Sequence, residues 1–172
     1  SKKLGINQAT AITCVKPSGT VSQLVDSASG LHARHSEYYI RTVRGDNKDP
    51  MTQFMKEQGI PNEPDLMHTE DNTVFSFPSK SPMKAVTRNE MTAIDQLEVW
   101  KMYAEHWCEH KPSATISVKQ DEWPSVGAWV WENFDICSGI SFLPTDDHVY
   151  QQAPYQDCTE EEYKMYLAQM PV

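Results

Sequence analysis

The side chains best suited to chemistry are concentrated in one short turn near the start of the sequence. A stretch typical of a β-strand ends there, turns over Ser18 and Gly19, and continues into a helix. The residues of the turn are Pro17, Ser18, Gly19, Thr20, Val21 and Ser22. Unpaired backbone N–H groups at the start of a helix favour an anion. The turn therefore predicts a phosphate site, with a phosphorylated small molecule as its ligand.

A simpler interpretation of the same turn is a helix cap. The sequence matches neither of the two common glycine-rich phosphate motifs. The Ser18 or Thr20 hydroxyl could instead serve as an ordinary N-cap. Three hydroxyl groups and one glycine within five residues are more than a cap requires. This surplus slightly favours a phosphate site over a helix cap.

A second group of polar residues follows the helix. Gly30 is suited to ending the helix, and His32, Arg34 and His35 come directly after it. Arg34 or a histidine could lie beside an anion held by the turn. A plain loop is an equal alternative, so His32 and Arg34 are candidate ligand-adjacent residues.

Two further patterns contain residue types suited to metal or redox chemistry. His106 and His110 have the spacing of a zinc pair on a helix, but Trp107 stands where a metalloprotease has glutamate. Histidines also favour the C-terminal end of a helix, so no metal site is predicted. The cysteines are Cys14, Cys108, Cys137 and Cys158, without a Cys-x-x-Cys pair. They are expected to be reduced thiols.

Composition limits the classes of function. The 172 residues can bury one core, so a domain or part of a larger one is expected. A net charge of −9 disfavours a nucleic-acid partner. The sequence contains no apolar run of membrane-spanning length and no secretory leader. These features predict a cytoplasmic protein that binds neither nucleic acid nor membrane.

Strand-like and helix-like segments alternate along the chain and must position the turn. Strands are predicted over 10–16, 38–44, 73–77 (ended by Pro78), 113–119 and 139–143. Helices are predicted from the turn to about 27, from 50 to 59, and over 92–110, 126–134 and 160–170. Alternation of this kind predicts an α/β fold with largely parallel strands. Ligands of such folds lie at the carboxyl ends of strands, where the turn falls.

Two of these helices carry clear apolar faces. The helix over 92–110 repeats Ile94, Leu97, Trp100, Ala104 and Trp107 at helical spacing. The helix over 126–134 is expected to point Val126, Trp129, Val130 and Phe134 inward. Both helices are therefore predicted to pack on the core.

Six blocks along nearly the whole chain resemble one known family. The blocks cover 16–22, 24–34, 38–41, 74–78, 112–117 and 139–144, and the first contains Pro-Ser-Gly-Thr. Together they are similar to the C-terminal part of the catalytic chain of adenosylcobalamin-dependent (class II) ribonucleotide reductases. Chance agreement would require six separate blocks to align in order.

The resemblance implies a fold, a cofactor and a role for the turn. It implies a segment of a ten-stranded α/β barrel, adenosylcobalamin as cofactor, and reduction of the ribose of ribonucleoside di- or triphosphates. It also implies that Pro17 to Ser22 bind the substrate phosphates. The ribonucleotide and the remainder of the reductase chain are the implied partners.

The sequence also departs from the family pattern. Members of the family carry a radical cysteine on a finger loop inside the barrel and a pair of reducing cysteines near the C-terminus. Neither motif is found in this sequence. Residues 1–172 are therefore expected to be a fragment that carries no catalytic residue and is inactive alone. The alternative from another class is a non-catalytic nucleotide- or phosphate-binding α/β module.

Overall fold

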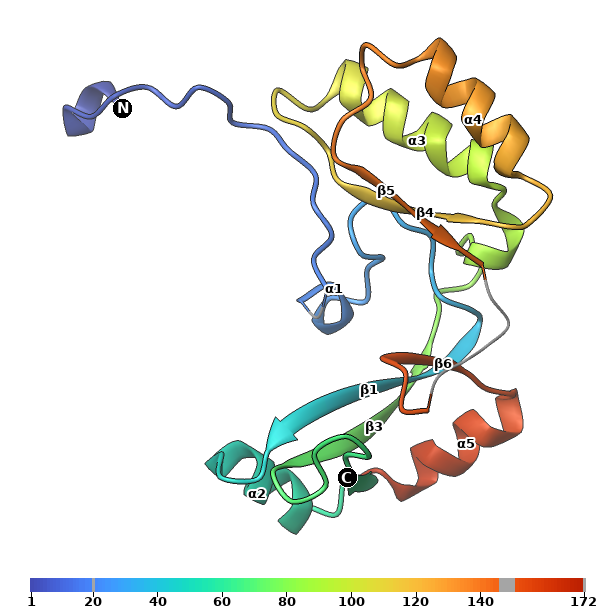
Figure 1. The fold of residues 1–172 in the computed structure, drawn as a ribbon. Helices are drawn as coiled ribbons and strands as arrows, with labels where there is room; N and C mark the ends of the chain where they lie inside the picture. Colours follow the sequence, from blue (N-terminus) through green and yellow to red (C-terminus); the bar gives the residue numbers. More distant parts are fainter. Residues whose placement is uncertain (20, 146–150, 172) are drawn as a thin grey trace. The chain divides into compact units, whose positions relative to one another are not determined.

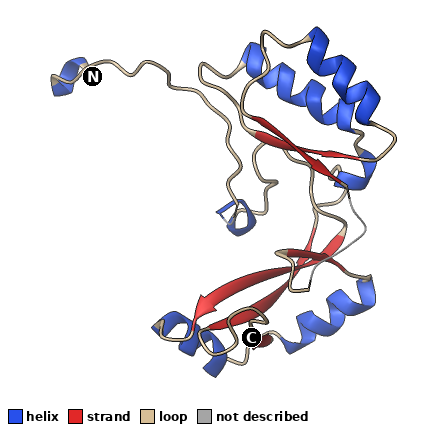
Figure 2. Cartoon of the chain, in the orientation of Figure 1, coloured by secondary structure: helices blue, strands red, loops and turns tan. Residues whose placement is uncertain are grey.

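The chain forms two compact units, each built from helices and strands (Figures 1 and 2). The computed structural model describes residues 1–19, 21–145 and 151–171. Unit 1 comprises Ser1–Arg34 and Arg88–Asp146, and unit 2 comprises His35–Thr87 and Asp147–Val172. The prediction of a mixed α/β chain is confirmed.

Unit 1 is built around a pair of parallel strands. Its elements are η1 (Lys2–Leu4), α1 (Val21–Leu24), η2 (Arg88–Glu90), α3 (Ala93–His106), β4 (Ala114–Val118), α4 (Trp123–Glu132) and β5 (Ile140–Pro144). Strands β4 and β5 run parallel, with Ala114 opposite Ile140 and Val118 opposite Pro144. Helices α3 and α4 lie over one face of this pair (Figure 1). Parallel pairing of these two strands is as predicted.

The core of unit 1 lies between these helices and β4. Leu97 and Trp100 of α3 are fully buried, and Ile116 of β4 and Trp129 of α4 pack in the same cluster. The Trp100 indole N–H donates to the carbonyl of Pro112 at 3.2 Å, so its polar atom is also satisfied. The apolar spacing in the sequence thus correctly identifies most of this core.

Two aromatic residues predicted to face inward are exposed. Trp107 follows the end of α3 at His106 and is 58% exposed, and Phe134 follows the end of α4 and is 71% exposed. Both helices end earlier than predicted, so helical spacing no longer directs these side chains to the core. Helix α4 also begins three residues before the predicted start at 126, at Trp123, with Pro124 in its first turn, where proline is well tolerated.

The strand predicted over 10–16 is wrong. The backbone N–H groups of Glu109 and His110 both donate to the carbonyl of Thr13, and Ser113 donates to that of Val15. These partners belong to the connection between α3 and β4, which is not a strand, so a regular ladder does not form. Local β-propensity is satisfied only when a partner strand is available.

Unit 2 is an antiparallel sheet with helices. Its elements are β1 (Tyr38–Asp46), α2 (Pro50–Glu57), β2 (Asn62–Pro64), β3 (Asn72–Lys80), β6 (Tyr155–Asp157) and α5 (Glu160–Gln169). The strand order is β2-β3-β1-β6, and every neighbouring pair is antiparallel. The prediction of largely parallel strands is therefore wrong for unit 2. Helix α2 follows β1 but does not lead to a parallel neighbour, because β3 returns beside β1.

Strand β3 also continues past the residue predicted to end it. Pro78 lies within β3, opposite Ile40 of β1. On the other side of β3, strand β2 pairs with residues 73–75. Proline lacks an N–H and is accepted where one edge of a strand is not paired. The predicted boundary at Pro78 was therefore too early.

An ion pair between the buried Asp65 carboxylate and the partly exposed Arg44 side chain stabilises the loop between β2 and β3. Asp65 is 1% exposed, and its carboxylate accepts hydrogen bonds from the Met67 N–H at 2.9 Å and the Arg44 Nε at 3.0 Å. The Met67 N–H is the largest factor that lowers the pKa of Asp65 below its usual value, and Arg44 adds to this. The carboxylate form is thus favoured in the folded state.

Acidification is expected to destabilise unit 2 through Asp65. Because the folded pKa is lowered, the stabilisation is present above the unfolded pKa of about 3.9 and is lost as the pH falls through the folded value. Urea unfolding measured from pH 7 down to pH 2 should show this loss, and Asp65→Asn should flatten the profile. Glu57→Gln, at an exposed carboxyl on α2, serves as the control. An unchanged profile for Asp65→Asn would contradict the assignment.

None of the helices formed by the described residues combines the length and apolar character needed to cross a bilayer.

Candidate functional site

The turn singled out in the sequence lies at the surface of unit 1. Pro17, Ser18 and Gly19 are exposed, and Gly19 has a φ of +60°, a left-handed conformation that favours glycine. Nothing lies within 4 Å of the position that a Gly19 Cβ would occupy. Thr20, also predicted to belong to the site, lies outside the described residues. The turn is thus open to a ligand.

The helix that follows the turn is shorter than predicted. Helix α1 spans only Val21–Leu24, where the sequence predicted a helix to about 27. It ends because Asp26 adopts a left-handed φ of +49°. A single turn of helix carries little macrodipole. Any attraction for an anion must therefore come from individual hydrogen-bond donors around the turn.

Val21 and Ser22 differ in their surroundings. Val21 is 65% exposed, whereas Ser22 is buried at 3%. The Ser22 hydroxyl donates to the carbonyl of Gly19 at 3.3 Å. Ser22 therefore supports the shape of the turn from the inside.

Ser29, which is not among the residues predicted for the site, contacts the backbone of the turn. Its Oγ accepts hydrogen bonds from the Ser18 N–H at 3.1 Å and from the Gly19 N–H at 3.2 Å. Two successive amides that point at one oxygen form a concave donor pair of the kind that binds anions, and here the Ser29 hydroxyl occupies it. Ser18 and Ser29 are eleven positions apart, so no local sequence pattern reveals this contact.

Gly30 brings the two loops into close contact. It has a φ of +62°, and a Cβ at this position would lie 2.8 Å from the carbonyl oxygen of Lys16. Only glycine fits here without moving the backbone. The Lys16 ammonium is bound to the Lys111 carbonyl at 2.6 Å and to Ser113 Oγ at 2.7 Å. The base of the turn is therefore anchored on both sides.

His32 connects this loop to β4. Its Nδ1 lies 2.7 Å from the carbonyl oxygen of Ser29, and its Nε2 accepts a hydrogen bond from the Thr115 N–H at 3.1 Å. A carbonyl can only accept, so Nδ1 carries the proton and the ring is neutral. His32 is thus connected to the turn through Ser29.

Arg34 is buried and contacts Asp26, two residues after the end of α1. It is 6% exposed, and its Nη2 forms an ion pair with the exposed carboxylate of Asp26. Among the described residues, no hydrogen-bond partner is present for its Nε and Nη1 atoms. A buried guanidinium with free donors is costly unless an acceptor reaches it. Arg34 therefore retains donors for a further negatively charged group.

The histidine pair considered for zinc is separated by the end of a helix. His106 is the last residue of α3, and His110 lies in the following loop with its N–H bound to Thr13. The two no longer share one helix face. Within the described ranges, no group of three or more His, Cys, Asp and Glu side chains is placed to hold a metal ion.

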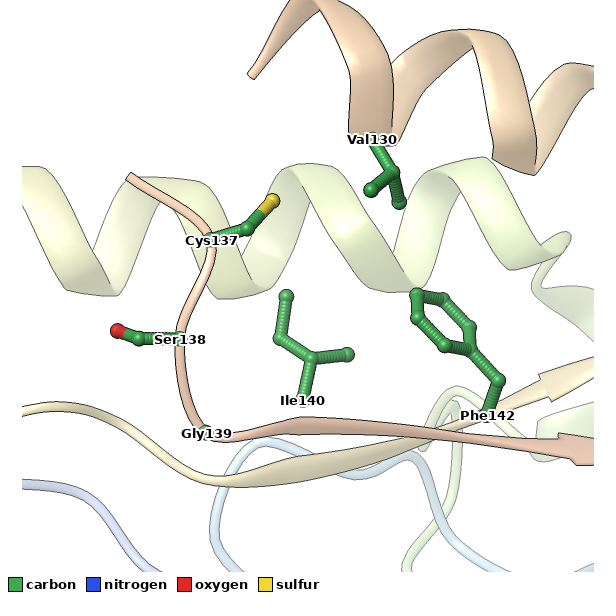
Figure 3. Close-up of a pocket in the computed structure, with 6 residues that line it drawn as sticks. All are labelled: Val130, Cys137, Ser138, Gly139, Ile140 and Phe142. Carbon is green, nitrogen blue, oxygen red and sulfur yellow. The ribbon is translucent and has the colours of Figure 1, made fainter. Parts of the chain in front are cut away.

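A small pocket lies between α4 and β5. It has a volume of about 120 Å³ and is lined by Val130, Cys137, Ser138, Gly139, Ile140 and Phe142 (Figure 3). Burial raises the pKa of the Cys137 thiol, which keeps it protonated and unreactive. The pocket is mainly apolar, which fits a gap in the core better than a site for a charged ligand.

Known proteins related to this chain are ribonucleotide reductases. The adenosylcobalamin-dependent ribonucleoside-triphosphate reductase of Lactobacillus delbrueckii subsp. bulgaricus is 29% identical over 168 residues, which cover 95% of this chain and 23% of that protein. A probable enzyme of the same name from Dictyostelium discoideum is 31% identical over 175 residues, covering 99% of this chain and 23% of that one. The Euglena gracilis reductase is 28% identical over 166 residues, with coverage of 95% and 23%.

The structural comparison agrees. A crystal structure of a B12-dependent (class II) ribonucleotide reductase matches 100% of this chain and 24% of its own, with a TM-score of 0.83 and 27% sequence identity. No protein-family model matches the chain. The chain spans about a quarter of the length of the curated relatives it matches. It therefore belongs to the family of adenosylcobalamin-dependent (class II) ribonucleotide reductases.

Proposed function

We propose that this chain is a segment of a class II ribonucleotide reductase and contributes the loop that holds the phosphates of the ribonucleotide substrate. The observation that carries the proposal is the exposed turn at Ser18 and Gly19, whose backbone is held in one conformation by two hydrogen bonds to Ser29 Oγ. It lies in a chain whose relatives are named ribonucleoside-triphosphate reductases. Those names support a ribonucleoside triphosphate as substrate.

Each part of the site has a distinct role in this proposal. The Ser18 hydroxyl offers a donor to phosphate oxygens, with Thr20 next along the chain, while the Ser18 and Gly19 amides are bound to Ser29 Oγ and hold the turn in its conformation. Arg34 adds a buried positive charge, with Nε and Nη1 donors that no described residue accepts. Charge-assisted hydrogen bonds of this kind are stronger than neutral ones. A phosphate can thus be bound locally by a protein of net charge −9.

The cofactor of the family does not fit the small pocket beside Cys137. Adenosylcobalamin supplies the radical that starts ribose reduction in these enzymes. The pocket beside Cys137 is about 120 Å³, below the range of about 300 Å³ and more for ordinary ligand pockets. A corrin is larger still. This pocket is therefore too small to hold the cofactor.

The rest of the polypeptide is the proposed partner of unit 1. Strands β4 and β5 form a two-stranded parallel sheet, and such sheets normally occur as part of larger, covered sheets. Ile12, Leu24 and Val25, at 70–82% exposure, leave apolar surface near the turn. Both features support the expectation that this segment completes a ten-stranded α/β barrel. The alternative of an independent phosphate-binding module explains neither of them.

A charge placed on the turn tests the proposal. In the full-length reductase, Ser18→Glu puts a carboxylate beside the expected phosphates, and repulsion of roughly 1–3 kcal/mol should result. The dissociation constant for CTP or CDP, titrated separately by calorimetry, should rise about 5- to 150-fold. Ser18 is exposed, so the fold should be unaffected.

The matched control is Ser125→Glu, which adds the same charge at an exposed position of α4. It should leave nucleotide affinity unchanged. Equal affinities for the wild type and Ser18→Glu would remove the turn from the substrate site. The ratio of the CTP and CDP constants in the wild type reports which phosphate chain the site prefers.

A further inference from the structure

The conformation of the turn that is proposed to hold the substrate phosphates depends on the Ser29 side chain, which lies eleven positions after Ser18 and ten after Gly19. Ser29 Oγ accepts from both the Ser18 and the Gly19 N–H groups. A serine hydroxyl has two acceptor lone pairs and one donor proton. Both lone pairs are thus occupied by the turn, and the two bonds hold its backbone in one conformation. Ser29 therefore holds the turn in its observed conformation.

Ser29 is in turn held by His32. The Nδ1–H of the imidazole donates to the Ser29 carbonyl at 2.7 Å. On the opposite side of the ring, Nε2 accepts from the backbone N–H of Thr115 in β4 at 3.1 Å. Each ring nitrogen therefore has one partner, and only the neutral imidazole with its proton on Nδ1 satisfies both.

The anchoring point is a rigid part of unit 1. Thr115 is the second residue of β4, paired with Ser141 of β5, and its hydroxyl contacts that of Ser141 at 3.1 Å. Its neighbours Ala114 and Ile116 are buried in the core. The N–H that binds His32 thus comes from backbone fixed by a strand and by core packing.

We propose that Ser29 and His32 are positioning residues for nucleotide binding, forming a relay that fixes the phosphate turn against β4. The relay runs from the Thr115 N–H through the His32 ring and the Ser29 backbone to the amides of Ser18 and Gly19. His32 then acts on the ligand through Ser29 and does not touch it. This inference rests on the proposed function for its link to the nucleotide, but the relay itself can be tested without ligand.

Hydrogen exchange in the ligand-free, full-length reductase provides that test. His32→Phe keeps the ring but removes both hydrogen bonds, and Ser29→Ala removes the acceptor for the two amides. Each should accelerate exchange of peptides containing Ser18 and Gly19 roughly tenfold, as expected when a hydrogen bond of ordinary strength is lost. The control is His106→Phe at the exposed end of α3, which should leave exchange unchanged. Unchanged exchange in His32→Phe would overturn the relay whatever the nucleotide does.

Steady-state kinetics separate positioning from a general structural effect. His32→Phe should raise KM for the nucleotide about tenfold with kcat unchanged, because the lost interaction affects binding in the ground and transition states alike. His32→Asn retains an N–H donor near the Nδ1 position and should restore most of the wild-type KM. The double variant Ser29→Ala/His32→Phe should be no worse than either single variant, since both act in one chain of contacts.

The outcomes distinguish this inference from the proposed function. Faster exchange with an unchanged KM would overturn the positioning role while leaving the relay as a structural contact. If Ser18→Glu also leaves affinity unchanged, the proposed function fails as well. Faster exchange, raised KM and rescue by His32→Asn together support both.

Discussion

Trp100→Ala is expected to destabilise unit 1 by about 3–5 kcal/mol, the usual cost of truncating a large aromatic residue in a core. Trp100 lies on α3, is fully buried, and belongs to the same core cluster as Ile116 of β4. Its removal leaves a cavity and also leaves the Pro112 carbonyl without its indole donor. Hydrogen exchange of β4 amides in the full-length reductase, or urea unfolding of the 172-residue chain, measures the loss.

Trp131→Ala is the matched control for this substitution. Trp131 lies on α4 and is 82% exposed, so the same change should alter stability by no more than about 0.5 kcal/mol. Similar losses in the two variants would show that Trp131 is covered in the protein or that Trp100 is not a core residue. The comparison therefore tests burial directly, with residue type held constant.

Gly139→Ala is expected to produce the second large loss of stability, about 2–5 kcal/mol. Gly139 has a φ of +68°, which costs a residue with a Cβ about 1–2 kcal/mol. The added methyl carbon would also lie 2.6 Å from the Pro112 carbonyl oxygen, and relief of such overpacking typically costs a further 1–3 kcal/mol. The Gly139 carbonyl accepts from the Ala114 N–H, so the distortion reaches the start of the β4–β5 pair. Urea unfolding monitored by tryptophan fluorescence should report it.

Gly127→Ala should have the opposite sign. Gly127 lies inside α4, and nothing is within 4 Å of its Cβ position. Alanine is favoured over glycine inside a helix by roughly 0.5–1 kcal/mol. A stabilised Gly127→Ala beside a destabilised Gly139→Ala would confirm both backbone assignments. Destabilisation in both would mean that the α4 surface is covered in the full-length protein.

Elements with strong local signals were predictable from the sequence. Thr92 and Thr159 each begin a helix with a capping box, and Pro50 begins α2 at a position that needs no N–H. The alternation over 113–119 correctly predicted β4, with its buried residues at every second position. In these cases the residues that define the element are neighbours in the sequence, so their pattern is sufficient.

Predictions that required a distant partner were less successful. The segment 10–16 has apolar and β-branched residues, but the carbonyl groups of Thr13 and Val15 accept hydrogen bonds from the connection between α3 and β4 and not from a partner strand. The direction of the unit 2 strands depends on how β3 returns beside β1, which alternation of helices and strands does not reveal. The exposure of Phe134 depends on where α4 ends. Each of these features is decided by packing between segments.

The sequence alone determined the likeness to class II ribonucleotide reductases and the chemistry available at the turn. Its hydroxyls, its glycine and its nearby histidine and arginine were all visible as residue types within a short span. Only the tertiary structure decided how they are used: Ser29 meets the Ser18 and Gly19 amides, and His32 reaches Thr115, 83 residues further along the chain. The reason is physical, because a hydrogen bond depends on distance and direction in space. Those are set when the loop packs against β4, and no spacing in the sequence encodes them.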